Sequence, residues 1–67
     1  MKLSDLAPVL RSVTGNITFA IVYDVDLYMD IENGCSVDYA VANYGDWHLE
    51  RITADGDNVV LHVRKED

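Results

Sequence analysis

Ten residues in the middle of the sequence, "YDVDLYMDIE" (residues 23–32), carry a regular series of carboxylates. The even positions of this stretch hold four acids and one tyrosine: Asp24, Asp26, Tyr28, Asp30 and Glu32. Residues two apart on a β-strand point the same way, about 6.6 Å from each other. Neighbouring phosphates of a nucleic acid have a similar spacing, and carboxylates pair strongly with Arg. The pattern predicts an acidic face that mimics nucleic acid and binds a basic protein surface, with Tyr28 as its anchor.

The net charge of −7 is concentrated in the middle of the chain. No Lys or Arg occurs between Arg11 and Arg51, and three further acids there extend the predicted patch: Asp38, Asp46 and Glu50. Such a field attracts basic partners and repels nucleic acids and membranes, so we expect direct binding to neither. The alternative interpretation is a solvated face that keeps a small protein in solution, although ordinary surfaces intersperse both signs of charge.

The residue types used in catalysis and metal binding do not form a recognisable site. Cys35 is the only cysteine, and no nucleophile signature surrounds it. Asp24 and Asp26 match the first and third positions of a calcium-binding loop, but Met29 stands where that loop requires Gly. We therefore expect a non-enzymatic protein without metal or cofactor. A looser divalent-cation site at the Asp24/Asp26 turn stays open as an alternative.

The 67 residues suffice for a single domain, 1–67. A domain of this size buries only about 60% of the surface that its unfolded chain exposes, so its stability should be marginal and a dimer, a partner or very regular packing would help. We expect a weak homodimer or a marginal monomer. A lone cysteine is typical of a reducing compartment. The chain has no apolar run long enough for a membrane span, and its start does not have the pattern of a signal peptide. These features predict a protein of the cytoplasm.

The first half of the chain has a helical pattern followed by a strand pattern. Ser4 is a candidate N-cap for a helix whose apolar face comprises Leu6, Val9, Leu10 and Val13, with Gly15 in a stop at 14–16. From 17 to 31 every odd residue is large and apolar.

A single strand over residues 17–31 would span roughly 50 Å, whereas a domain of this size has a radius of gyration near about 11 Å. We expect a hairpin that turns at residues 24–26, pairs Tyr23 with Leu27, Ile21 with Met29 and Phe19 with Ile31, and points its odd residues at the core. A bent strand shared across a dimer is the alternative.

The second half predicts a short helix and a second hairpin. Ser36 is a candidate cap for a helix over 37–44 that ends at Gly45, although a strand over 36–44 is the alternative. A loop at 55–58 would pair Ala54 with Val59 and Ile52 with Leu61. The predicted fold class is α+β, a small antiparallel sheet from two β-hairpins with an N-terminal helix and a short middle helix, in the order α-β-β-α-β-β.

The opening "MKLSDLAPVL" and the closing "LERITADGDNVVLHVRKED" resemble the ends of short acidic proteins encoded in phages and prophages of Gram-positive bacteria. Many of those proteins have a capped first helix, a "Y-D" strand end and a last hairpin of the form I-x-A-x-x-x-x-V-x-L-x-V. The matching residues here are Ile52, Ala54, Val59, Leu61 and Val63. The likeness covers about half the chain, and the segment from Cys35 to Trp47 departs from it.

The resemblance implies an anti-defence protein, such as an anti-CRISPR inhibitor that acts in the host cell cytoplasm. Its partner would be a nucleic-acid-binding protein of the host, reached through the acidic face. Two alternatives belong to other classes: a module that sequesters a small ligand such as a nucleotide signal, and a minor structural or assembly protein of the phage particle.

Overall fold

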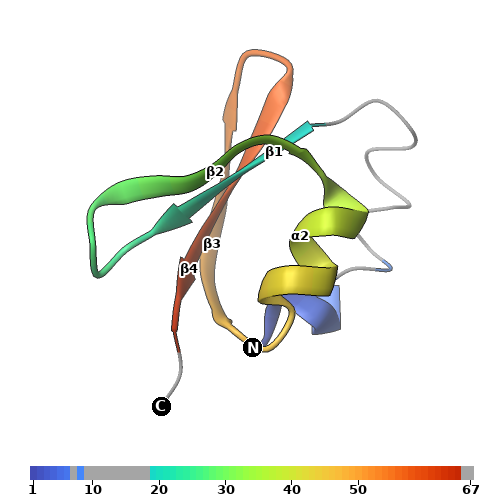
Figure 1. Ribbon diagram of the computed structural model, residues 1–67, viewed down its shortest axis with the longest axis vertical. Helices are drawn as coiled ribbons and strands as arrows, with labels where there is room; N and C mark the ends of the chain where they lie inside the picture. The colour runs from blue at the N-terminus through green and yellow to red at the C-terminus, as the bar shows by residue number, and fades with distance from the viewer. Residues whose placement is uncertain (7, 9–18, 66–67) are drawn as a thin grey trace.

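The computed structural model describes residues 1–6, 8 and 19–65, which form one four-stranded sheet with helical segments packed on it (Figure 1). Residues 3–6 are helical. The later elements are β1 (Phe19–Asp24), β2 (Met29–Ser36), α2 (Val37–Tyr44), β3 (His48–Asp55) and β4 (Asn58–Arg64). This composition and order confirm the predicted α+β class and the sequence α-β-β-α-β-β.

The sheet has the order β2-β1-β4-β3, and its two hairpins meet in the middle. Each hairpin is antiparallel, but β1 and β4 run parallel. The prediction of an antiparallel sheet is therefore correct within each hairpin and wrong between them. The reason is α2, which directly follows β2 and carries the chain back along the sheet. Strand β3 consequently runs in the direction of β2, as in any helical crossover, and β4 in that of β1.

Composition explains which strands lie at the centre. Strands β1 (FAIVYD) and β4 (NVVLHVR) are the most apolar, so burial between neighbouring strands on both sides stabilises them most. Strands β2 (MDIENGCS) and β3 (HLERITAD) carry more charge and form the edges. Their register is interrupted by bulges, a common device that protects an exposed edge from pairing with another chain. No helix in the described part of the chain is long and apolar enough to cross a membrane.

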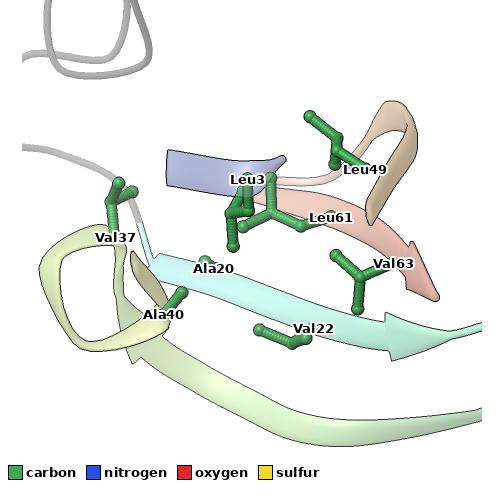
Figure 2. Packing of buried hydrophobic residues seen from close by; sticks show 8 residues of the cluster. All are labelled: Leu3, Ala20, Val22, Val37, Ala40, Leu49, Leu61 and Val63. Atoms are coloured by element: carbon green, nitrogen blue, oxygen red, sulfur yellow. The ribbon is translucent and has the colours of Figure 1, made fainter. Parts of the chain in front are cut away.

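The core lies between the helical segments and one face of the sheet (Figure 2). Its buried members are Leu3, Ala20, Val22, Val37, Ala40, Leu49, Leu61 and Val63. Strand β1 thus contributes even-numbered residues, so the prediction that its odd residues form the core is wrong. Ile21 on the opposite face is also buried, at 6% exposed. Because β1 carries apolar residues on both faces, the alternation of its odd-numbered residues did not identify the face that the helices cover.

The β1–β2 hairpin exists, but its register differs from the predicted one. The turn occupies residues 25–28, and Asp24 rather than Tyr23 is the last paired residue, opposite Met29. Ile21 pairs with Asn33 and Phe19 with Ser36, instead of Met29 and Ile31. Two register shifts along β2 skip Ile31 and Gly34, and each extra residue changes which side chains face the core. Gly34 has φ 85°, a conformation that glycine adopts without strain.

The N-terminal helix begins two residues earlier than the predicted Ser4 cap implies. Leu3 is already helical, and Asp5 accepts a hydrogen bond from the backbone N–H of Lys2 at 3.1 Å, as in one half of a capping box. The predicted Ser4 cap is therefore wrong. Backbone bonds of 3.0 Å from Leu3 to Trp47 and from Ser4 to Gly45 join this helix to the turn after α2. The predicted helix residues Val9, Leu10 and Val13 and the stop at 14–16 lie outside the described residues.

The predicted middle helix is confirmed as α2, and the strand alternative is excluded. The Ser36 hydroxyl accepts a hydrogen bond from the N–H of Tyr39 at 3.0 Å. Gly45 ends the helix as predicted, and its backbone is right-handed, with φ −59°. A larger residue does not fit at this position, because a Cβ there would lie 2.5 Å from the carbonyl oxygen of Val41.

The predicted second hairpin is also confirmed in register. Ala54 pairs with Val59 and Ile52 pairs with Leu61. Gly56 in its turn has φ 62°, the left-handed region that two-residue hairpin turns require and glycine tolerates.

The core assignment predicts that truncating two directly paired residues, Leu61 and Ile52, changes the free energy of unfolding by very different amounts. Leu61→Ala should lower the free energy of unfolding by about 2–5 kcal/mol, because Leu61 is fully buried and the truncation leaves a cavity. Ile52→Ala, at its cross-strand partner, removes an exposed side chain and should cost about 1 kcal/mol or less. Urea unfolding followed by circular dichroism measures both. Equal losses would contradict this core.

Candidate partner-binding surface

Asp24 builds the turn of the β1–β2 hairpin. Its side chain lies on the core side and is only 5% exposed. Its Oδ1 accepts hydrogen bonds from the backbone N–H groups of Asp26 at 2.9 Å and Leu27 at 3.2 Å. An aspartate that bonds to backbone groups two and three residues ahead stabilises a turn. Asp24 is therefore occupied within the fold, and it presents no carboxylate to a partner.

The residues that follow form the hairpin tip, which we define as residues 26–30. Three consecutive large side chains are exposed there: Leu27 by 61%, Tyr28 by 83% and Met29 by 51%. Asp26 and Asp30 flank them and are exposed as well. In Figure 1 the hairpin extends away from α2, so the tip projects from the molecule. Contiguous exposed apolar side chains on a small protein are typical of interaction sites.

Tyr28 has an unusual backbone conformation. Its φ of 56° is the only positive value of a non-glycine residue in the described part of the chain. An L-residue in the left-handed region crowds its Cβ against the backbone, which costs roughly 1–2 kcal/mol. Asn or Gly would occupy this position at a lower cost. The tip therefore retains a tyrosine where local stability favours another residue.

Glu32 is used in a contact between β2 and α2. Its Oε1 accepts a hydrogen bond from the Tyr44 hydroxyl at 2.9 Å and one from the Tyr39 hydroxyl at 3.4 Å. Desolvation and then the hydrogen bond to Glu32 raise the pKa of Tyr44 to about 12. The charge of Glu32 is the main cause that raises the pKa of Tyr39. Glu32 is half-buried in this cluster.

The remaining three predicted residues lie on other elements. Asp38 is exposed in the first turn of α2, where a negative charge is favourable for the helix dipole. Asp46 is exposed in the turn after α2. Glu50 lies on edge strand β3 and forms a salt bridge of 3.1 Å with Arg64. Of the eight predicted residues, the structure brings Asp26, Tyr28 and Asp30 together at the tip. It does not join all eight into one evenly spaced row.

Sequence reasoning missed a polar row on the face of the sheet opposite the core. Pairing places Asp30, Tyr23, His62 and Arg51 side by side across all four strands. The rings of Tyr23 and His62 meet edge to face at 5.2 Å, and His62 Nε2 lies 2.9 Å from the Thr53 hydroxyl. Desolvation and the charge of Arg51 lower the pKa of His62, and Asp30 partly opposes them. Only the strand order, which is non-local, could have predicted this row.

Cys35 does not have the environment of a reactive thiol. Burial and then the charge of Glu32 raise its pKa, which disfavours the nucleophilic thiolate. Within the described residues, no group of three or more His, Cys, Asp or Glu side chains is placed to hold a metal ion.

Comparison of the chain with protein-family models, with curated proteins and with solved structures gives no match.

The backbone strain at Tyr28 predicts a stabilising substitution. Tyr28→Asn should raise the free energy of unfolding by about 0.5–1 kcal/mol, because Asn tolerates the left-handed region and the lost side chain is almost fully exposed. Met29→Asn is the matched control, since it also removes an exposed apolar side chain but relieves no strain. It should leave the stability unchanged or lower. Chemical denaturation of both variants measures the difference, and a destabilised Tyr28→Asn variant would contradict it.

The Glu32–Tyr44 contact predicts a late step in the alkaline titration. The folded pKa of Tyr44, about 12, lies above the ordinary value of 10.0, so the folded state holds this proton more tightly. The contribution to stability is complete below about pH 10 and is lost as the pH rises toward 12. Tyrosinate absorbance near 295 nm should show this late step, and Tyr44→Phe should remove it. Tyr28→Phe, which alters an exposed tyrosine outside this contact, should retain it. Persistence of the late step in Tyr44→Phe would exclude the assignment.

Proposed function

We propose that the protein is a non-enzymatic inhibitor of the phage type, which binds a basic nucleic-acid-binding protein of host defence, such as a CRISPR-like effector complex. It would act in the host cytoplasm and prevent the target from binding nucleic acid. One observation carries the proposal: Tyr28, 83% exposed, stands between two exposed carboxylates on a projecting hairpin.

The chemistry of the hairpin tip suits an anchor surrounded by charge. Tyrosine is enriched among the residues that dominate binding energy, because its ring fills a pocket and its hydroxyl still finds a partner. Leu27 and Met29 beside it would exclude water from the contact. Asp26 and Asp30 would pair with Lys or Arg at the rim of that pocket. Such pairs mainly speed the encounter and select the partner, while the aromatic anchor slows dissociation.

The charge distribution selects the class of partner. No Lys or Arg occurs from residue 12 to residue 50, so the tip and α2 belong to a segment with no cation to contact a phosphate. Binding of nucleic acid depends on such contacts and on the counterions they release. An anionic membrane surface would be repelled for the same reason. A basic protein surface, of the kind that holds a nucleic acid, gains from every one of these charges.

The contact we propose is narrower than an evenly spaced acidic row. Asp24 and Glu32 are engaged by backbone and tyrosine groups, so Asp26 and Asp30 remain for direct pairing. Asp38, Asp46 and Glu50 would contribute through the long-range field. The class of target is supported by the resemblance of the chain ends to phage proteins.

A mobility-shift assay tests the proposal. A guide-RNA nuclease is mixed with labelled target DNA, and the protein is added at increasing concentration. The parent protein should reduce the shifted fraction and should not itself shift the DNA. The double variant Asp26→Asn/Asp30→Asn should need at least about tenfold more protein, because two partner cations lose their counter-charges. Asp55→Asn/Asp57→Asn, with the same change of net charge at the β3–β4 turn, is the matched control and should inhibit like the parent.

The variant Tyr28→Ala tests whether the tyrosine ring itself contributes to binding, in addition to the charges of the neighbouring carboxylates. It should leave the association rate nearly unchanged and speed dissociation by about tenfold or more, as expected for a central aromatic contact. Surface plasmon resonance with immobilised nuclease measures both rates. If the tip variants and the control variant inhibit equally, the tip is not the binding site. If a panel of guide-RNA nucleases is unaffected by the parent, the proposed target class is wrong.

A further inference from the structure

A cavity of about 280 Å³ lies at the C-terminal end of α2, distant in sequence from the hairpin tip. Its lining comes from three segments: the last turn of α2, the turn that follows it, and the N-terminal helix. The polar and aromatic members are Ser4, Asn43, Asp46 and Trp47. The backbone hydrogen bonds from Leu3 to Trp47 and from Ser4 to Gly45, each 3.0 Å long, hold the three segments together.

The electrostatics of the cavity favour a cation. The C-terminal end of a helix carries a partial negative charge from its unpaired carbonyl groups. The last turn of α2 contains no basic residue to offset that charge. Asp46, directly beyond the helix end, adds a full negative charge at the cavity wall. A cation in the cavity would meet both contributions.

The lining offers several hydrogen-bond acceptors. Asn43 donates its Nδ2 hydrogen to the backbone carbonyl of Tyr39 at 2.9 Å, which leaves its Oδ1 as an acceptor. The Ser4 hydroxyl and the Asp46 carboxylate can also accept. A ligand with several N–H donors can pair with these three acceptors.

Trp47 narrows the choice among cations. Its half-buried ring is held edge to face against Tyr44, with the ring centres 5.2 Å apart and an interplanar angle of 90°. A flat guanidinium stacks on an indole ring and offers five donors in one plane. An ammonium group is a compact, strongly hydrated charge that stacks poorly. A divalent metal ion would find only one carboxylate in the lining.

We infer that this cavity binds a guanidinium group, supplied either by an arginine side chain of a protein or by a free arginine derivative. The inference rests on the cavity alone and does not depend on the proposed function. It assigns Asp46 the ionic contact and Trp47 the stacking surface.

Trp47 is the only tryptophan of the chain, so its fluorescence reports on the cavity without a label. The full-length protein is titrated with arginine amide, with lysine amide and with the tripeptide acetyl-Gly-Arg-Gly-amide at constant ionic strength. N-acetyltryptophanamide serves as the reference for collisional quenching, which is linear and does not saturate. We expect a saturable change with arginine amide and at least about threefold weaker binding of lysine amide. Asp46→Asn should weaken arginine binding by about fivefold, and Asp57→Asn, with the same charge change elsewhere, should not.

The two arginine probes distinguish the sources of the group. Binding of the tripeptide at least as tight as that of arginine amide assigns the cavity to a protein side chain. Binding of arginine amide alone assigns it to a small molecule. No saturable change, equal binding of lysine and arginine amides, or equal losses in Asp46→Asn and Asp57→Asn would each overturn the inference. Circular dichroism of the two variants confirms that they are folded as the parent is.

Discussion

The parallel pairing of β1 with β4 is the contact on which the rest of the structure depends. It joins residues about forty apart in sequence, with Val22 opposite Leu61 and Ala20 opposite Val59. Neither hairpin alone has enough apolar area to be stable in water, since an isolated two-stranded ribbon is marginal. Joined through their most apolar strands, they form one face broad enough for α2 and the N-terminal helix to cover. The edges are then left to β2 and β3, whose charges tolerate water.

The parts of the fold that were predictable from sequence are those that local chemistry determines. The Ser36 cap and the turn at 55–58 each depend on residues within a few positions, and both were found. The β1–β2 register was not predicted correctly, because two bulges, at Ile31 and Gly34, set it, and these bulges follow from packing. The strand order was not predictable either, since β1 is apolar on both faces and does not reveal its neighbour. The same limit applies to the candidate site. Tyr28 was predicted as part of an evenly spaced row of side chains on a strand, but the structure places it in the turn of the hairpin, where that row is interrupted.

Four carboxylates of equal chemistry have different roles because their neighbours differ. Asp24 is buried by the turn it stabilises, and Glu32 accepts hydrogen bonds from two tyrosine hydroxyls. Each accepts hydrogen bonds from donors of its own fold, which leaves it less free to pair with another molecule. Asp26 and Asp30 are exposed, one within the turn and one opposite Tyr23 on the uncovered face. Position relative to the turn, rather than position in an alternating pattern, thus decides which acids can meet another molecule.

The composition of the hairpin tip is difficult to explain by stability alone. A domain of 67 residues has little stability to spare, and yet residue 28 is a strained tyrosine between two exposed aliphatic side chains. Such a tip would ordinarily invite association between copies of the chain. The flanking acids oppose that, because two tips brought together would place like charges side by side on molecules that each carry a net charge of −7. The same charges favour a basic surface. The tip is therefore apolar enough to anchor a contact and acidic enough to disfavour self-association, a combination that suits recognition of a basic partner.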